Sequence, residues 1–72
     1  MNEREKLEAI RVPAKVLDGI EAVRQSGLVN MLDRNGVAEV AHALGLPAVA
    51  DWVLAEPGQY ARGIFRGFVA EE

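Results

Sequence analysis

Two arginines one helical turn apart, Arg62 and Arg66, are the residues of this 72-residue chain whose types and spacing best suit a contact surface. They stand close in sequence to the aromatic residues Tyr60, Phe65 and Phe68. Arginine and aromatic side chains are enriched at the energetic centres of protein interfaces. The same types can also clamp a phosphate and stack on a base. The stretch therefore predicts a surface for a macromolecule or an anionic nucleotide, unless the rings belong to the core and the arginines are merely solvated.

Residues that could perform catalysis form a weaker pattern. Nucleophilic catalysis needs a nucleophile, a base and a group that orients the base, and Ser26, His42 and Asp33 are the only such set of types. Serine at a helix end, histidine beside an apolar stripe and aspartate as a helix cap are ordinary structural roles. The carboxylates of Asp18 and Glu21 share what reads as a solvated helix face. We therefore expect no enzymatic activity and no catalytic residues.

Composition narrows the classes of ligand and compartment. The chain has no cysteine and one histidine, so we expect no disulfide, no metal site and no cofactor. Its net charge of −3 disfavours nucleic acid, because proteins that grip phosphates usually run basic. No apolar run approaches the roughly 20 residues of a membrane span, and the charged start Met1–Lys6 does not resemble a signal peptide. We expect a cytoplasmic protein without membrane contact.

The first half of the chain predicts two helices separated by a turn. Pro13 ends a charged lead-in and suits the first position of a helix, whose apolar stripe is Val16, Leu17, Ile20 and Val23. Gly27 can end that helix in the left-handed conformation. Asp33 is the favoured cap of the next helix, with Asn35 as the alternative. The second stripe is Val37, Val40, Ala41 and Leu44, and Gly45 ends it.

The second half predicts two more short helices. Pro47 opens the third, which runs to about Ala55 and carries Trp52 on a flank. The fourth runs from Gln59 to about Val69, with Gly63 and Gly67 inside it. Glycine costs roughly 1 kcal/mol against alanine inside a helix. Small residues four apart on a helix also allow another backbone to approach closely, so the alternatives are a close helix contact and a fraying terminal helix.

The predicted fold is all-α: a small bundle of three to four short helices. We expect residues 1–12 to form a charged arm or short helix, residues 13–69 the helical domain and residues 70–72 a mobile tail. A chain this short buries only about 60% of its unfolded surface, and small scaffolds usually need further support. We therefore expect self-association as a homodimer or a higher assembly. Trp52 and Tyr60 join Arg62 and Arg66 as the predicted contact residues.

A helix-turn-helix is a further alternative for Val37 to Leu54. Ala41, Gly45 and Leu46 suit the usual alanine and turn glycine of that motif. Asp51, however, stands where a buried aliphatic residue is expected. The second helix, Pro47 to Ala55, also contains no Arg, Lys, Asn or Gln, the side chains that mostly read base edges. A DNA-binding regulator is therefore the less favoured alternative.

One segment resembles a known family. The chain reads Val23-Arg24-Gln25-Ser26-Gly27 and then Asn30-Met31-Leu32-Asp33, which resembles an uncharacterised family of short proteins encoded by phages and prophages, with an Ile-Arg-x-Ser-Gly-x-x-Asn-Met-Phe-Asp core. Further matches follow at Val37, Val40-Ala41, Gly45-Leu46, Tyr60-Ala61-Arg62, Ile64 and Gly67. The chain departs from the family at Leu32, Leu46 and Gly63, where the family has aromatic residues.

The resemblance implies a small accessory protein of a mobile genetic element, working in the host cytoplasm. Such proteins commonly bind a host or phage macromolecule as an anti-defence or regulatory factor; the first alternative is an oligomer that sequesters an anionic nucleotide signal. On this basis Asn30 and Met31 are candidate contact residues. The alternative is that the amide of Asn30 satisfies backbone groups of a turn and that Met31 fills the core.

Overall fold

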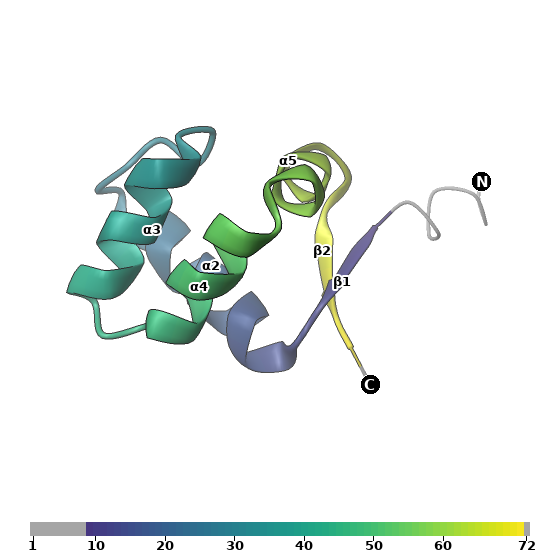
Figure 1. Ribbon diagram of the computed structural model, residues 1–72, viewed down its shortest axis with the longest axis horizontal. Coiled ribbons are helices and arrows are strands. Elements are labelled where there is room, and N and C mark those ends of the chain that lie inside the picture. Colours follow the sequence, from purple (N-terminus) through teal and green to yellow (C-terminus); the bar gives the residue numbers. More distant parts are fainter. Residues whose placement is uncertain (1–8, 72) are drawn as a thin grey trace.

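A computed structural model describes residues 9–71 of the chain. Within that part, four helices and two short strands follow one another (Figure 1). The elements are β1 (Ile10–Val12), α2 (Ala14–Ser26), α3 (Arg34–Ala43), α4 (Pro47–Ala55), α5 (Pro57–Arg66) and β2 (Phe68–Ala70). No helix among the described residues is both long and apolar enough to cross a membrane.

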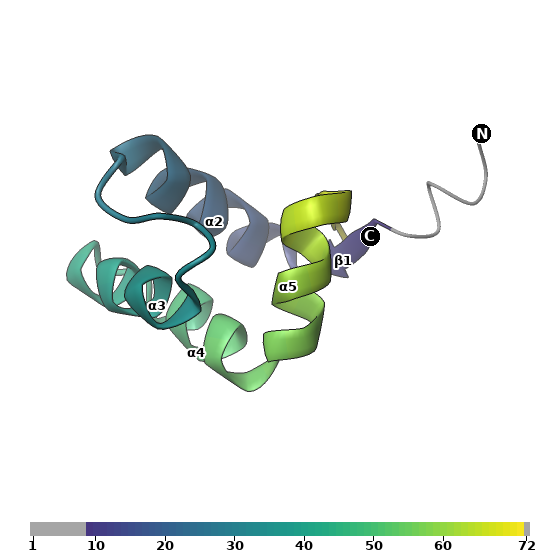
Figure 2. The same ribbon diagram turned by 90° about the horizontal axis from the view of Figure 1, so that it is seen from above.

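The core lies where α2, α3 and α4 pack together, and α5 runs across one end of this three-helix unit (Figure 2). Its fully buried members are mostly valines and alanines, with Ile20 and Tyr60 the larger side chains. Such small side chains let the helices approach closely. A Cβ on Gly19 of α2 would lie 2.0 Å from Cγ2 of Val49 in α4, so this glycine is what allows the α2–α4 crossing.

The helix ends follow the local signals of the sequence. The Oδ1 atom of Asp33 accepts a hydrogen bond from the backbone N–H of Gly36 at 3.0 Å, which makes Asp33 the cap of α3 as predicted. Gly27 ends α2 in the left-handed region with φ of 69°. Pro47 begins α4 and Ala55 ends it, as expected. Pro13 precedes α2 instead of forming its first residue, a difference of one position.

The two strands correct the all-α prediction. β1 and β2 pair in parallel, with Ile10 opposite Phe68 and Val12 opposite Ala70. The backbone N–H of Ile10 donates to the carbonyl of Gly67 at 3.0 Å. This pairing joins the two ends of the described chain through hydrogen bonds that neither segment can form alone.

Several predicted boundaries change, and among them the last helix begins at Pro57 and not at Gln59. Residues 10–12 of the predicted arm form a strand and not a helix, while residues 1–8 lie outside the described part. The last helix ends at Arg66 and not at Val69, because Gly67 turns the backbone with φ of 95°. Ala70, which we expected to begin a mobile tail, is the last residue of β2. The molecule is therefore mostly helical, with a small two-stranded sheet.

Candidate binding site

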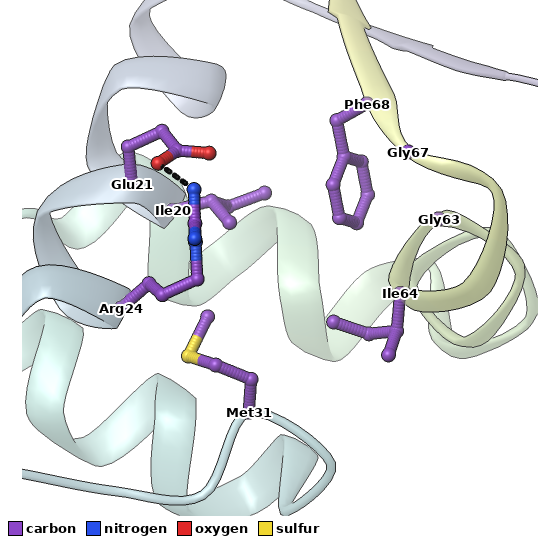
Figure 3. Close-up of a pocket in the computed structure, with 8 residues that line it drawn as sticks. All are labelled: Ile20, Glu21, Arg24, Met31, Gly63, Ile64, Gly67 and Phe68. Atoms are coloured by element: carbon purple, nitrogen blue, oxygen red, sulfur yellow. Dashed lines mark hydrogen bonds and ion pairs between the residues drawn. The ribbon is translucent and has the colours of Figure 1, made fainter. Parts of the chain in front are cut away.

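An open hollow of about 300 Å³ lies between α2, the segment that joins α2 to α3, and the junction of α5 with β2 (Figure 3). Four apolar side chains line it: Ile20 from α2, Met31 from the joining segment, Ile64 from α5 and Phe68 from β2. All four are buried or half-buried. The hollow is therefore suited to an apolar group.

An ion pair stands on one side of this hollow. Glu21 and Arg24, one turn apart on α2, line it, and a guanidinium nitrogen of Arg24 donates to Oε1 of Glu21. The two side chains are 42% and 60% exposed. Such a pair adds little to stability because water screens it. Both groups can instead meet a charged or polar group of a ligand.

Met31 is positioned by hydrogen bonds of its own segment. The hydroxyl of Tyr60 in α5 donates to the backbone carbonyl of Met31 at 2.5 Å. The Oδ1 atom of Asn30 accepts the backbone N–H of Leu32 at 2.9 Å, forming an Asx turn. These hydrogen bonds hold the segment against α5. The position of the Met31 side chain at the edge of the hollow therefore does not depend on packing alone.

The hydroxyl that holds the segment is itself in an unusual environment. Tyr60 is only 2% exposed. Burial, together with the smaller effect of the nearby negative charge of Asp33, raises the pKa of Tyr60 to about 12. The hydroxyl therefore keeps its proton, and with it the bond to Met31, well beyond neutral pH.

The ring of Phe68 forms the opposite wall and depends on a glycine. A Cβ on Gly63 would lie 2.1 Å from Cε1 of Phe68, so the ring occupies the space above residue 63. The ring also meets Trp52 edge-on, with centroids 6.1 Å apart, and Tyr60 at 6.0 Å. Gly63 thus lets β2 place an aromatic ring directly on α5.

Comparison with protein families gives one match. Residues 12–68 match the model of a family described as Domain of unknown function (DUF5049). The chain belongs to this family. The match contains every residue that lines the hollow. Comparisons with curated proteins and with solved structures found no match.

A second hollow of the domain, of about 190 Å³, lies on the neighbouring side of α5. Its lining residues are Leu32, Arg34, Pro57, Tyr60, Ala61, Ile64 and Phe65. Ile64 lines both hollows. Leu32 and Phe65 are 64% and 81% exposed, so large apolar side chains stand in solvent at its edge. The two hollows give α5 an apolar surface on two sides.

The predicted contact residues lie in different environments. Met31 lines the first hollow. Asn30 is exposed, and its side chain satisfies the turn, in keeping with the alternative interpretation. The ring of Tyr60 lies in the core, which corrects the expectation that this ring faces a partner. Trp52 is half-buried against Phe68. The structure brings Met31 and Tyr60 together through the hydrogen bond from the Tyr60 hydroxyl to the Met31 carbonyl.

Arg62 and Arg66 lie on the outer side of α5. Both are exposed and share that side with Phe65, since residues three and four apart lie on one face of a helix. Neither arginine lines the first or the second hollow. A ligand of these arginines would therefore bind on the open surface.

Sequence reasoning missed the residues that form the first hollow apart from Met31. Ile20 was recognised only as a member of an apolar stripe, and Ile64 only as a match to the resembled family. Phe68 was assigned to a helix and lies on a strand. Glu21 and Arg24 have the spacing of an ion pair on a helix. That spacing could have been used to predict the charged side of the hollow. No group of three histidine or acidic side chains in the described part could hold a metal ion.

Proposed function

We propose that this chain is a small accessory protein of the phage-encoded kind that binds a partner protein through the hollow between α2 and α5. The observation that carries the proposal is a preformed apolar hollow of about 300 Å³ with a charged pair beside it. An apolar side chain of the partner would fill it. Burying one such side chain contributes roughly 1.5–3 kcal/mol.

The family motif suggested by the resemblance supports this location. Its first part and its closing part are far apart in sequence, yet residues from both line the hollow. Arg24 and Met31 come from the Arg-x-Ser-Gly-x-x-Asn-Met part, and Ile64 and Gly67 come from the closing part. Residues of a shared motif that converge on one surface are better explained by a common task of that surface than by packing alone.

The chemistry of the hollow favours binding over catalysis. The ionisable side chains that line it are Glu21 and Arg24, and each already pairs with the other. Its remaining side chains are apolar. Convergent apolar walls with a few polar groups are typical of recognition sites. On this proposal the protein works in the host cytoplasm as a regulatory or anti-defence factor.

Two alternatives find less support in the geometry. Arg62 and Arg66 stand on the outer side of α5 and not around a hollow, so an anionic nucleotide would meet them on an open surface. A DNA-reading α4 would present its exposed residues, which are Pro47, Ala48, Asp51, Leu54 and Ala55. None of the five is a usual donor to base edges. A macromolecular partner of the apolar hollow therefore remains the favoured function.

A photo-crosslinking amino acid placed in the hollow tests the proposal. The crosslinker replaces Met31 in one protein and the exposed Asp51 of α4 in a control protein. Each is expressed in the cell that carries the gene and irradiated there. We expect one discrete protein adduct at position 31 and none at position 51, identified by mass spectrometry.

A matched pair of variants then tests whether the hollow itself is responsible. Ile64→Lys introduces a charge into the hollow, while Leu44→Lys introduces the same change at the far end of α3, where Leu44 is exposed. Circular dichroism checks that both variants fold. Ile64→Lys should lose the partner and Leu44→Lys should keep it. Because Ile64 lines both hollows, Phe65→Lys serves as a second control that places the charge at the second hollow alone, and it should also keep the partner. Equal retention by both folded variants would show that the hollow is not the binding site.

A further inference from the structure

The first turn of α3 contains the dipeptide Asn35-Gly36. Asparagine is a chemically labile residue, and it loses its side-chain amide most readily when glycine follows. Glycine has no side chain that hinders its own backbone nitrogen from reaching the Cγ atom of the asparagine before it. Glycine also weakens a helix. Two disadvantages at one place of the chain call for a structural reason.

The packing around Gly36 supplies that reason. A Cβ at position 36 would lie 2.5 Å from Oδ2 of Asp33 and 2.8 Å from Cγ2 of Val29. Both distances are shorter than a Cβ atom tolerates, so a side chain here would displace the carboxylate that caps α3. The cap therefore requires glycine at position 36, and the labile pair with Asn35 is a consequence of that requirement.

The same cap restrains the reactive nitrogen. The backbone N–H of Gly36 donates to Oδ1 of Asp33 at 3.0 Å, and the backbone N–H of Val37 donates to the carbonyl of Asp33 at 2.8 Å. An amide nitrogen attacks only after it has lost its proton, and a carboxylate beside it opposes a second negative charge. The two bonds also hold the backbone of Asn35 in the helical conformation, in which the side chain cannot close a ring onto the next nitrogen.

We propose that Asn35 is a site of self-modification that the Asp33 cap keeps inactive. When the start of α3 opens locally, the nitrogen of Gly36 gives up its proton and attacks Cγ of Asn35. A bond forms between these two atoms, the bond from Cγ to Nδ2 breaks, and the amino group leaves with that proton as ammonia. Water, the one co-reactant, then adds to either carbonyl carbon of the ring and opens it, which leaves aspartate or isoaspartate at position 35.

Either product changes the start of α3. Asn35 is exposed, so water reaches the ring. An aspartate adds a negative charge to the first turn, where the positive end of the helix stabilises it. An isoaspartate lengthens the main chain between Asp33 and Val37, whose hydrogen bond spans this position. The modification therefore either adds a charge to the helix start or breaks its first turn.

Peptide mapping by mass spectrometry follows the reaction in the full chain at mildly alkaline pH, and an isoaspartyl methyltransferase labels the isoaspartate product. The chain in guanidinium chloride gives the rate without the cap. We expect the folded chain to convert Asn35 roughly tenfold or more slowly than the denatured chain. Asn35→Gln should abolish the products at position 35, because glutamine has to close a larger ring.

Two variants separate the cap from a general loss of stability. Asp33→Ala removes the capping carboxylate, and the usual cost of losing a cap corresponds to about fivefold more frequent opening of the helix start. Gly27→Ala should lower the stability of the whole domain by a similar amount and leave the cap of α3 intact. We expect Asp33→Ala to convert Asn35 about fivefold faster than the unmodified chain, and Gly27→Ala to convert it at the unmodified rate.

The inference is overturned if Asp33→Ala converts Asn35 no faster than Gly27→Ala does. It is also overturned if the folded chain converts Asn35 as fast as the denatured chain, because the cap would then give no protection. All of these measurements are made on the isolated chain without a partner, so their outcome leaves the proposed function to its own test.

Discussion

Replacing Tyr60 with phenylalanine removes the hydroxyl that holds the α2–α3 segment and keeps the ring in the core. The lost interaction is the bond from the hydroxyl to the carbonyl of Met31 at 2.5 Å. Met31 is half-buried, so water can reach part of the freed carbonyl and limit the cost. We expect Tyr60→Phe to lower the free energy of unfolding at pH 7 by about 1 kcal/mol. For a domain of this size that corresponds to a fall in Tm of roughly 4–8 °C.

The same variant should also change how stability depends on pH. The pKa of Tyr60 rises from 10.0 to about 12 in the folded chain, so the folded state holds the phenolic proton more tightly than the unfolded state does. The stability linked to this proton is fully present below pH 10 and is lost as the pH rises towards 12. A shift of about two pKa units corresponds to roughly 3 kcal/mol.

Urea unfolding followed by the fluorescence of Trp52, the single tryptophan, measures both effects. Unfolding curves for the two proteins are compared between pH 7 and pH 12, so that changes shared with other titrating groups cancel. The original chain should be the more stable protein at pH 7 and should lose that advantage between pH 10 and pH 12. Equal stability at pH 7 together with parallel pH profiles would refute the assigned bond and the raised pKa.

Three further substitutions, two of them paired with a control variant, test the backbone and packing arguments by urea unfolding. Gly63→Ala should lower the free energy of unfolding by about 1–3 kcal/mol, because its Cβ would meet the ring of Phe68 at 2.1 Å. The control Gly58→Ala has only the guanidinium of one arginine nearby, so it should be neutral or stabilise by up to about 1 kcal/mol. Equal effects of the two substitutions would contradict the placement of the ring. Asp33→Ala should lower the free energy of unfolding by about 1 kcal/mol, and Asp33→Asn by much less, since asparagine also caps helices. A large loss of stability in both variants would mean that the charge of Asp33 matters and its capping bond does not. Gly27→Ala should cost about 1 kcal/mol at its φ of 69°, and an unchanged midpoint would show that the turn adapts.

The helix ends could be predicted because their signals are local. Asp33 needs only the backbone N–H three residues ahead to act as a cap. Gly27 needs only its own freedom to adopt a positive φ. Pro47 excludes itself from the interior of a helix by its missing N–H. Each of these effects is complete within a few residues, so reading the sequence in short windows recovers it.

The strands could not be predicted in the same way. Ile10–Val12 and Phe68–Ala70 are three residues each and find their hydrogen-bond partners almost the whole chain apart. Within either window, the apolar residues fit a helical stripe as well as a strand. Two weaker signals remain: the alternation of apolar and polar residues at Ile10, Arg11 and Val12, and the glycine before Phe68. They indicate strands only when it is known that the two segments lie side by side.

The candidate site shows the same division. Helical spacing places Tyr60 and Ile64 on one side of α5, and Ala61 and Phe65 on another. Both sides carry an aromatic ring, so periodicity alone does not decide which one is buried. The bare backbone of Gly63 settles the matter, because it admits the ring of Phe68 beside Tyr60. The sequence-based choice of Tyr60 as a surface residue was therefore wrong for a reason outside its own helix.

By itself, the amino-acid sequence determined where α2, α3 and α4 start and stop, to within about one residue, and that a small aliphatic core forms, since capping, backbone freedom and apolar periodicity act over one or two turns. Tertiary structure decided the rest. It paired the two strands, turned Tyr60 inward and Phe65 outward, and brought Ile20, Met31 and Phe68 around one hollow. These outcomes depend on contacts between segments distant in sequence, whose energies exist only after the helices have packed.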